Sequence, residues 1–440
     1  SKSLSVNSMI MTRYIQINPA DNVAVALCPL TKGMIIELNG KRVELKEDIA
    51  TGHKIALKDF AQGEMVIKYG FPISHTVVEV KKGCLLDDKR MKTNLSGLDT
   101  YTYTPKFEEQ TFTNEERTFK GYLRPNGEAG IRNEIWIIPT VGCVNGVANQ
   151  LAEELRKETE CKGIDSIIAF PHNYGCSQLG DDHENTRKIL RDMVLHPNAG
   201  GVLVVGLGCE NNQPDVFREF VGEYDESRIK FMVAQKSEDE IAEGMSLLRE
   251  IYNLASQDVR TDIPLSELRV GLKCGGSDGF SGITANPLVG LFSDWLIAQG
   301  GTTILTEVPE MFGAETILMD RAINKEVFEN TVCLINDFKG YFRKYDQPIY
   351  ENPSPGNKKG GITTLEEKSL GCVQKGGRQP VVDVLSYGDK VKRPGLNLLS
   401  APGNDLVASS ALALSGCQMI LFTTGRGTPF GSVVPTMKIA

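Results

Sequence analysis

The stretch that decides the fold is IWIIPTVGC, residues 135–143, in which a short apolar run leads straight into a Gly–Cys step. The same arrangement recurs in SIIAFPHNYGC (166–176), VLVVGLGC (202–209) and VGLKCGGSD (270–278). Amphipathic stretches at helical spacing separate these runs. Short apolar strands that alternate with amphipathic helices predict parallel sheets with helices on their faces.

The parts of the chain that show this repeated pattern, and the part that lacks it, predict three units. Before residue 100 only short strands are evident, and Asn39-Gly40 between two apolar runs is a strong hairpin signal. A polar stretch without a clear period follows and is typical of a linker. We therefore predict an α/β protein with a small all-β N-terminal domain. The expected bounds are 9–100 for this domain, 101–117 for the linker, and 118–262 and 263–440 for two α/β units with parallel, Rossmann-like sheets.

Composition narrows the classes of partner. Lys and Arg number 48 against 56 Asp and Glu, and the net charge of -8 argues against nucleic-acid binding. No apolar run reaches the length of about 18 residues that a membrane span needs. No export signal is evident, so we expect a cytoplasmic protein whose ten cysteines stay free thiols. Homo-oligomerisation stays open.

The four strand-end cysteines are the first candidate site. In an open parallel sheet, ligands bind outside the carboxyl ends of the strands, so these four thiols could converge there. His172, four residues before Cys176, adds an imidazole suited to a transition metal or to acid–base work. The alternative is that each cysteine is a small buried residue at a tight strand exit. The candidate ligands are Cys143, His172, Cys176, Cys209 and Cys274; the other six cysteines (Cys28, Cys84, Cys161, Cys333, Cys372 and Cys417) are interpreted as structural.

Other loops carry groups that suit an anionic substrate. His53 lies in a Gly-His-Lys loop of the β-rich domain, and Arg426 lies among glycines at a strand exit, where a guanidinium can bind a carboxylate through two hydrogen bonds. Further polar loops are TEVPE (306–310), SAPGND (400–405) and ENPSPGNKKGG (351–361). None is a phosphate-binding Walker loop or a complete GxGxxG motif, so dinucleotide binding is weakly supported.

Several of these motifs resemble one known family. The segment GHKIALKDFAQGEMVIKYGFPI (52–73) is similar to the SAF-type β domain of sugar-acid dehydratases. Together with it, motifs spread over nearly the whole chain resemble the altronate/galactarate dehydratase family. They include YGCSQLGDDH (174–183), KCGGSDGFSGITANP (273–287), TEVPEMFGAE (306–315), QPIYENPSPGNKKGGITTLEEKSLG (347–371) and TTGRGTPFG (423–431). Members of the family continue past the last motif, so the resemblance implies a further segment after Ala440.

The resemblance implies a reaction and a cofactor. The expected activity is removal of water from D-altronate to give 2-dehydro-3-deoxy-D-gluconate, with a divalent metal, iron(II) or manganese(II). The candidate acid–base residues are His53, His172 and Tyr174, and the candidate substrate-binding residues are Lys54, Lys358 and Arg426. His172 cannot be both ligand and proton carrier, and the sequence leaves that choice open. We further expect the β-rich domain to dock over the strand ends and deliver His53 to the substrate.

Two alternatives remain at this stage. One is a dehydratase for galactarate or a related sugar acid, with an iron–sulfur cluster held by the strand-end cysteines. The other is a sugar-acid binding protein without catalytic activity.

Overall fold

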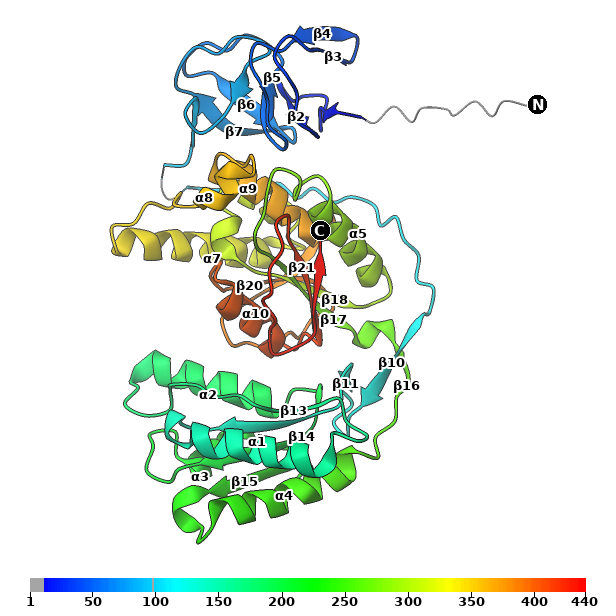
Figure 1. The fold of residues 1–440 in the computed structure, drawn as a ribbon, viewed down its shortest axis with the longest axis vertical. Coiled ribbons are helices and arrows are strands. Elements are labelled where there is room, and N and C mark those ends of the chain that lie inside the picture. Colours follow the sequence, from blue (N-terminus) through cyan, green and yellow to red (C-terminus); the bar gives the residue numbers. More distant parts are fainter. Residues whose placement is uncertain (1–11, 97–98) are drawn as a thin grey trace, which may run out of the picture.

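The computed structural model describes residues 12–96 and 99–440. It consists of three bodies stacked along the long axis, with the N-terminal domain at one end and the C-terminal domain in the middle (Figure 1). Residues 9–11, which we expected at the start of the N-terminal domain, lie outside the described residues. The prediction of a strand-rich N-terminal region followed by parallel sheets with helices is confirmed.

The N-terminal domain is built from short antiparallel strands. The predicted hairpin is present: β3 pairs with β4, and Asn39 and Gly40 between them have φ values of 50° and 74°, as a tight two-residue hairpin turn requires. The strands are β1 (Tyr14–Ile15), β2 (Val23–Ala26), β3 (Ile35–Leu38), β4 (Lys41–Glu44), β5 (Lys54–Ala56), β6 (Met65–Lys68), β7 (Phe71–Thr76), β8 (Leu85–Leu86) and β9 (Met91–Lys92).

Residues 101–117 form neither helix nor strand, in agreement with the predicted linker. They are nevertheless anchored on the C-terminal domain. The Tyr101 hydroxyl donates to Glu315 at 2.7 Å, and the Tyr103 hydroxyl donates to the Ala322 carbonyl at 2.7 Å. The segment therefore follows a fixed course from the first domain to the second.

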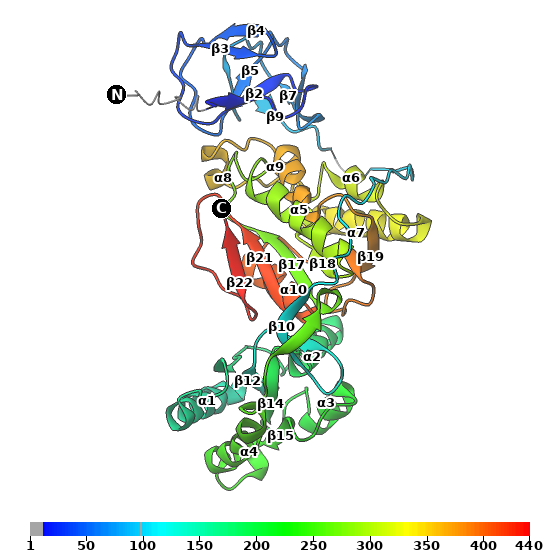
Figure 2. The same ribbon diagram turned by 90° about the vertical axis from the view of Figure 1, so that its right-hand side faces the viewer.

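A strand pair joins the two α/β units. β10 (Thr118–Leu123) pairs antiparallel with both β11 (Ala129–Gly130) and β16 (Thr261–Pro264), and it crosses between the middle and lower bodies in Figure 2. The sequence missed β16, because it lies in a polar stretch with only one buried side chain, Ile263.

The second domain has a four-stranded parallel sheet in the order β13-β12-β14-β15. Alternate side chains of β12 pack against α1 and α4 on one face and against α2 and α3 on the other. The strands predicted within 135–143, 166–176 and 202–209 are confirmed as Glu134–Pro139 (β12), Ser166–Ala169 (β13) and Ala199–Gly206 (β14). The fourth strand of the sheet is Ile229–Val233 (β15). The helices are Asn145–Thr159 (α1), Gly180–Val194 (α2), Pro214–Val221 (α3) and Glu240–Ala255 (α4), with 3-10 turns at Gly142–Val144 and Ala234–Lys236.

The C-terminal domain has a six-stranded parallel sheet in the order β19-β20-β18-β17-β21-β22. Its strands are β17 (Arg269–Cys274), β18 (Thr302–Leu305), β19 (Val381–Leu385), β20 (Gly395–Leu399), β21 (Met419–Thr423) and β22 (Thr436–Ile439). Its helices are α5 (Ala285–Ala298), α6 (Glu315–Met319), α7 (Lys325–Lys344), α8 (Pro355–Lys359), α9 (Leu365–Cys372) and α10 (Asp405–Leu414), with 3-10 turns at Leu265–Glu267, Val308–Glu310 and Val373–Gly376.

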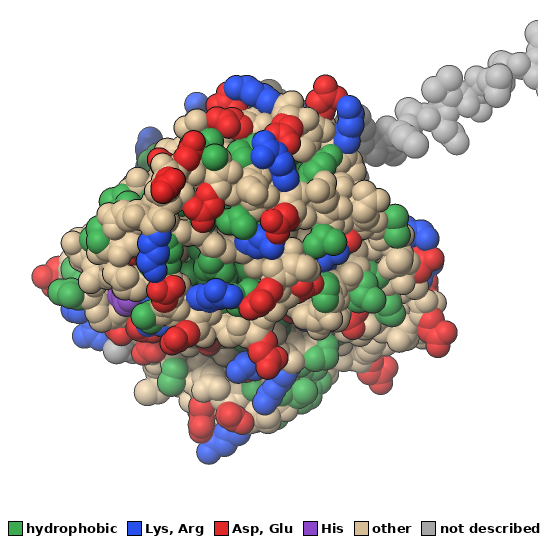
Figure 3. Space-filling model, turned by 90° about the horizontal axis from the view of Figure 1, so that it is seen from below, with side chains coloured by type: hydrophobic (Ala, Val, Ile, Leu, Met, Phe, Trp, Pro, Cys, Tyr) green, Lys and Arg blue, Asp and Glu red, His purple; other side chains and the backbone are tan. Residues whose placement is uncertain are grey.

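The surface matches the composition. Acidic and basic side chains are interspersed on the face shown in Figure 3, without a broad basic region on that face. Among the described residues, no helix combines the length and apolar character needed to cross a membrane.

Candidate active site

A cavity of 430 Å³ lies at the carboxyl ends of the strands of the C-terminal sheet. The loops that follow β17, β18, β20 and β21 form most of its wall, as expected for an open parallel sheet. Its size is within the range typical of small-molecule sites. The polar groups of the wall come from Cys274, Glu310, Asn352, Ser354, Asn357, Lys368, Asn404, Asp405 and Arg426.

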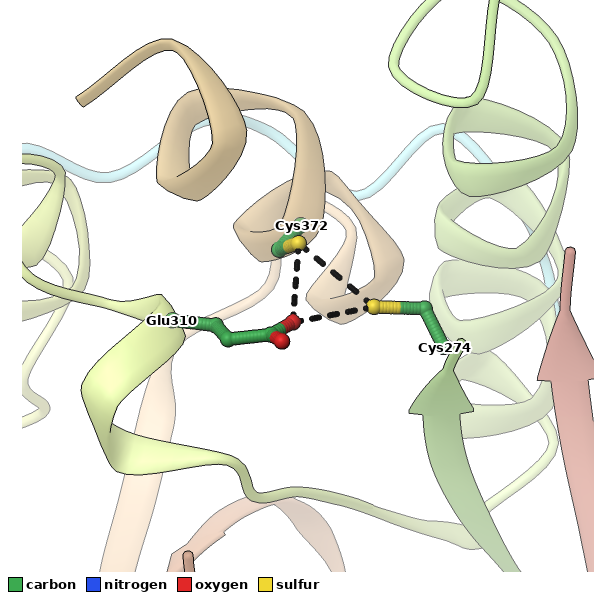
Figure 4. Close-up of side chains that lie close together, drawn as sticks. All are labelled: Cys274, Glu310 and Cys372. Atoms are coloured by element: carbon green, nitrogen blue, oxygen red, sulfur yellow. Dashed lines mark hydrogen bonds between the residues drawn. The ribbon is translucent and has the colours of Figure 1, made fainter. Parts of the chain in front are cut away.

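Two thiols and a carboxylate converge next to this cavity (Figure 4). Cys274 and Glu310 line the cavity, and Cys372 contacts both of them. The Sγ atoms of Cys274 and Cys372 each lie 3.2 Å from Oε2 of Glu310, and the two sulfurs are 3.5 Å apart. All three side chains are buried. Cys274 ends β17, Glu310 lies in the turn after β18, and Cys372 ends α9. Among the described residues, this is the one group of three potential metal ligands whose ligand atoms lie within 4.8 Å of one another.

Three buried lysines balance the carboxylates around this group. Lys368 pairs with Glu310 at 2.9 Å, and Lys375 pairs with Glu307 at 3.0 Å. Lys273 lies 2.6 Å from Glu307 and 2.8 Å from Asp405. Three lysines thus face three carboxylates, and the two thiols add no charge while they are protonated. A divalent cation that replaced the two thiol protons would leave the net charge of the site unchanged.

The ionisation of the site follows from these contacts. Burial alone would raise the pKa of Glu310, but Lys368, Lys273 and Lys375 hold it well below its ordinary value. The hydrogen bond to Cys274, burial and the neighbouring negative charges raise the pKa of Cys372 well above that of a free thiol. The carboxylate is therefore charged and Cys372 protonated until a cation displaces the proton. Two thiolates and one carboxylate fit iron(II), which accepts sulfur ligands, better than magnesium or calcium.

Helix α9 connects this cavity to the N-terminal domain. Every residue of α9 is buried. Oε1 of Glu366 accepts hydrogen bonds from the Thr93 hydroxyl at 2.9 Å and the Asn94 N–H at 2.6 Å. Glu367 pairs with Lys54 at 2.9 Å and Lys68 at 2.6 Å. These two acidic residues hold the N-terminal domain, while the residue after them, Lys368, reaches Glu310 in the cavity.

Lys54 must be reassigned from the substrate-binding set. Its ammonium is buried and bound to Glu367 and to the Gly361 carbonyl at 2.8 Å, so it joins two domains instead of facing a ligand. Burial lowers its pKa to about 8, although Glu367 opposes the shift. Its partner lies more than 300 residues away in the sequence, and no local pattern could identify it.

His53 lies at the same interface. Its Nε2 is 3.3 Å from the Lys359 carbonyl oxygen, and its Nδ1 is buried without a hydrogen-bond partner. A side chain at Gly52 would collide with the carbonyl of Gly360 and approach Gly279, so only glycine permits this close docking. The N-terminal domain thus rests on the segments that continue from the cavity wall. His53 itself is not among the residues that line the cavity.

The structure corrects the role expected of His172. Its Nδ1 accepts from the Tyr174 N–H at 3.1 Å, and its Nε2 faces the Pro139 carbonyl at 2.8 Å as donor. Burial lowers the pKa of this imidazole, which favours the neutral ring that these two bonds require. Neither nitrogen is free for a metal or a proton transfer. Tyr174 stacks on the same ring, with 59% of its surface exposed.

The expected single cluster of four cysteines is divided between two domains. Cys274 lies with Glu310 and Cys372, whereas Cys143, Cys176 and Cys209 are exposed thiols of the second domain. Cys143, Cys176 and Cys209 follow neighbouring strands of one sheet, as expected, whereas Cys274 ends a strand of the other sheet.

Of the two remaining candidate substrate-binding residues, one lines the cavity and the other does not. Arg426 lines the cavity, and its Nη1 donates to the Gly356 carbonyl at 2.9 Å. Lys358 is exposed on α8 and does not contribute to the wall, although its neighbour Asn357 does. The sequence interpretation missed Cys372, which was read as structural, and did not select Lys368.

Comparison with known proteins agrees along the whole described chain. Three family models match: the altronate/galactarate dehydratase SAF domain at 12–94, the D-galactarate dehydratase/altronate hydrolase second domain at 121–256, and the D-galactarate/altronate dehydratase C-terminal domain at 265–440.

Three curated relatives are similar over most of their length. Altronate dehydratase from Bacillus subtilis (strain 168) is 59% identical over 98% of this chain and 87% of its own. Altronate dehydratase from Escherichia coli (strain K12) is 57% identical over 97% of this chain and 87% of its own. Galactarate dehydratase (L-threo-forming) from the same organism is 34% identical over 97% and 84%. On this evidence the chain belongs to the altronate/galactarate dehydratase family.

Proposed function

We propose that this chain is a hydro-lyase that converts D-altronate into 2-dehydro-3-deoxy-D-gluconate in hexuronate catabolism, and that the reaction takes place in the 430 Å³ cavity. The choice of altronate as substrate is supported by sequence identity. The chain is 59% and 57% identical to two altronate dehydratases and 34% identical to a galactarate dehydratase. The place of the reaction is supported by one cavity that is lined by Arg426, Lys368, Cys274 and Glu310. Cys372 contacts the last two of these residues.

The reaction takes a proton from C2 and hydroxide from C3, which leaves as water after protonation. The enol that remains takes up a proton at C3 and becomes the 2-keto acid. Arg426 is suited to hold the substrate carboxylate, because a guanidinium can donate two parallel hydrogen bonds to it. The polar wall formed by Asn352, Asn357 and Asn404 offers partners for the hydroxyl groups of the sugar acid.

A divalent metal fits the buried group, and we propose iron(II), with manganese(II) as the second choice, at Cys274, Glu310 and Cys372. Bound there, it would supply a Lewis acid for the negative charge that develops as C2 loses its proton. Lys368 holds Glu310 ionised and oriented toward the two sulfurs. Lys273 and Lys375 both pair with Glu307 and hold its carboxylate in place. Oε1 of Glu307 in turn accepts a hydrogen bond from the backbone N–H of Cys274 at 3.0 Å.

A substrate panel tests this proposal. Anaerobically purified protein loaded with iron(II) is assayed on altronate, galactarate and mannonate, with detection of the 2-keto acid product. We expect the highest kcat/KM for altronate. A higher kcat/KM for galactarate would reassign the substrate within the family. Binding of altronate without any turnover would favour a sugar-acid binding protein and overturn the enzymatic assignment.

A further inference from the structure

The three exposed cysteines of the second domain lie outside the proposed dehydration site. Cys143 follows β12, Cys176 follows β13 and Cys209 follows β14, and all three are free thiols. These strands are immediate neighbours, with β12 between the other two, and all run parallel. The three thiols therefore leave the sheet at the same edge.

Hydrogen bonds tie the three loops to one another. The N–H of Gly142, beside Cys143, donates to the Tyr174 carbonyl at 3.0 Å. The carbonyl of Gly175, beside Cys176, accepts from the Asn212 N–H at 3.0 Å, in the loop that carries Cys209. A second bond, from the Ser177 N–H to Asn211 Oδ1 at 2.6 Å, joins the same two loops. The cysteines thus belong to one connected surface.

The position in the sheet is one where parallel sheets bind ligands. From β12 the chain passes to β13 on one side and then to β14 on the other, so its direction across the sheet reverses beside β12. In open parallel sheets, ligands bind beside the strand ends at such a reversal, between the loops after the two strands. Cys143 and Cys209 lie on the two loops that border it, and Cys176 lies on the third.

A buried polar atom at this edge lacks its partner. Asn212 is 2% exposed, and its Nδ2 donates to the Thr140 carbonyl at 3.3 Å, whereas its Oδ1 has no hydrogen-bond partner. An unpaired buried amide oxygen is unfavourable, so a bound group that contacts it is expected at this edge.

The available ligands favour a cluster over a single ion. The three sulfurs are not among the groups whose ligand atoms lie within 4.8 Å of one another. His172 has both nitrogens engaged, and Glu210 is occupied by the Thr140 hydroxyl at 2.7 Å and the Gly208 N–H at 2.6 Å. Neither of these two side chains is therefore free to complete a tetrahedral ion site with the three sulfurs. In an iron–sulfur cluster each cysteine binds a different iron, so the sulfurs stand farther apart.

We propose that Cys143, Cys176 and Cys209 hold an iron–sulfur cluster at this edge, with one iron left without a protein ligand. Each thiol releases its proton as its sulfur binds iron, and soft thiolate ligands favour such clusters. The site is separate from the cavity of the C-terminal domain and does not rest on the proposed dehydration.

The test is anaerobic reconstitution of the full chain with sulfide and equal amounts of iron(II) and iron(III). Bound iron, acid-labile sulfide and visible absorbance are measured for wild type and for Cys143→Ser, Cys176→Ser and Cys209→Ser. Cys333→Ser, at an exposed thiol of α7, is the matched control, and Cys372→Ser reports on the other site. We expect labile sulfide in the wild type and both controls, and at least a tenfold loss in each of the three variants.

A second measurement uses the unmodified chain. Before reconstitution, iodoacetamide should label Cys143, Cys176, Cys209 and Cys333, and afterwards only Cys333 of these four, as read by mass spectrometry. Iron without labile sulfide would overturn the proposal. So would unchanged sulfide in the three variants, loss of sulfide in Cys372→Ser, or unchanged labelling of the three cysteines.

Discussion

At the scale of single residues, the charge of Glu310 depends on its lysine neighbours. Lys368 is the nearest of them and lies 2.9 Å from Oε1, whereas the two sulfurs contact Oε2. The pair orients one carboxylate oxygen toward the proposed metal while the other is neutralised. Partners of this kind commonly change metal affinity by about 10–100-fold when they are removed.

Lys368→Met should therefore weaken iron(II) binding by about 10–100-fold. It should also make binding more sensitive to acid. Lys368 lowers the pKa of Glu310, so its removal raises that pKa toward the ordinary value of 4.5 and the carboxylate takes up a proton at a higher pH. Metal titrations from pH 5 to pH 8 measure both effects, with Lys358→Met on α8 as the exposed control. An affinity and pH profile equal to those of the wild type would show that Lys368 has no such role.

At the scale of secondary structure, α9 is a short helix with charged residues on its buried sides. Thr364 caps its first turn and donates its hydroxyl to the Ile73 carbonyl at 2.6 Å, which fixes the helix to the N-terminal domain. Glu367 then neutralises Lys54 and Lys68, both of which are fully buried. Because these contacts hold the other residues of the helix, Lys368 reaches the cavity and Cys372 reaches Cys274 and Glu310.

Glu367→Gln should destabilise the protein by about 3–5 kcal/mol, because it leaves two buried ammonium groups without their carboxylate. The two lysines hold the pKa of Glu367 well below its ordinary value of 4.5 despite burial. Its contribution is thus complete above pH 4.5 and is lost as the pH falls toward the native pKa. Urea unfolding at pH 7 and pH 4 measures this, with Glu329→Gln, at an exposed ion pair of α7, as the control. Equal stability of Glu367→Gln and wild type at pH 7 would contradict the account.

The helices and strands also show which parts of the fold and the site could be predicted from the sequence alone. The apolar strands that lead to Cys143, Cys176, Cys209 and Cys274 were predictable because their pattern is local. The loops with Cys274, Glu310 and Arg426 were recognised as polar strand exits, and one sheet brings them together. Cys372 and Lys368 could not be identified from the sequence, because contacts with the N-terminal domain determine where α9 lies. A short helix whose charged residues are all buried has no amphipathic pattern to reveal which side faces a site.

At the scale of the whole molecule, the N-terminal domain covers the segments that continue from the cavity wall. His53 reaches this interface with one nitrogen, Nδ1, buried and without a partner. We propose that this nitrogen serves proton transfer once substrate is bound. His53→Gln can still donate to the Lys359 carbonyl but cannot carry a proton.

His53→Gln should lower kcat on altronate by about 100-fold or more, the usual effect of losing a positioned acid–base group. Its metal content and thermal unfolding should equal those of the wild type, because the interface contact is kept. His75→Gln, at a histidine of β7 whose Nδ1 lies 2.9 Å from Asn94 Oδ1, is the matched control. Turnover within a few-fold of wild type would limit His53 to an interface role.

The central claim is that the Cys274–Glu310–Cys372 group holds the metal for sugar-acid dehydration. The most direct test compares Cys372→Ser with Cys333→Ser and wild type, after anaerobic loading with iron(II). Altronate turnover, bound iron and labile sulfide are measured on the same samples. Iron bound in excess of labile sulfide reports on the Cys274–Glu310–Cys372 group, because the iron of a cluster is accompanied by sulfide. We predict that Cys372→Ser loses this iron and about 100-fold or more of its turnover, since a Lewis acid contributes several kcal/mol to such a reaction, while Cys333→Ser matches wild type. Wild-type turnover in Cys372→Ser, or full retention of this iron, would contradict the account.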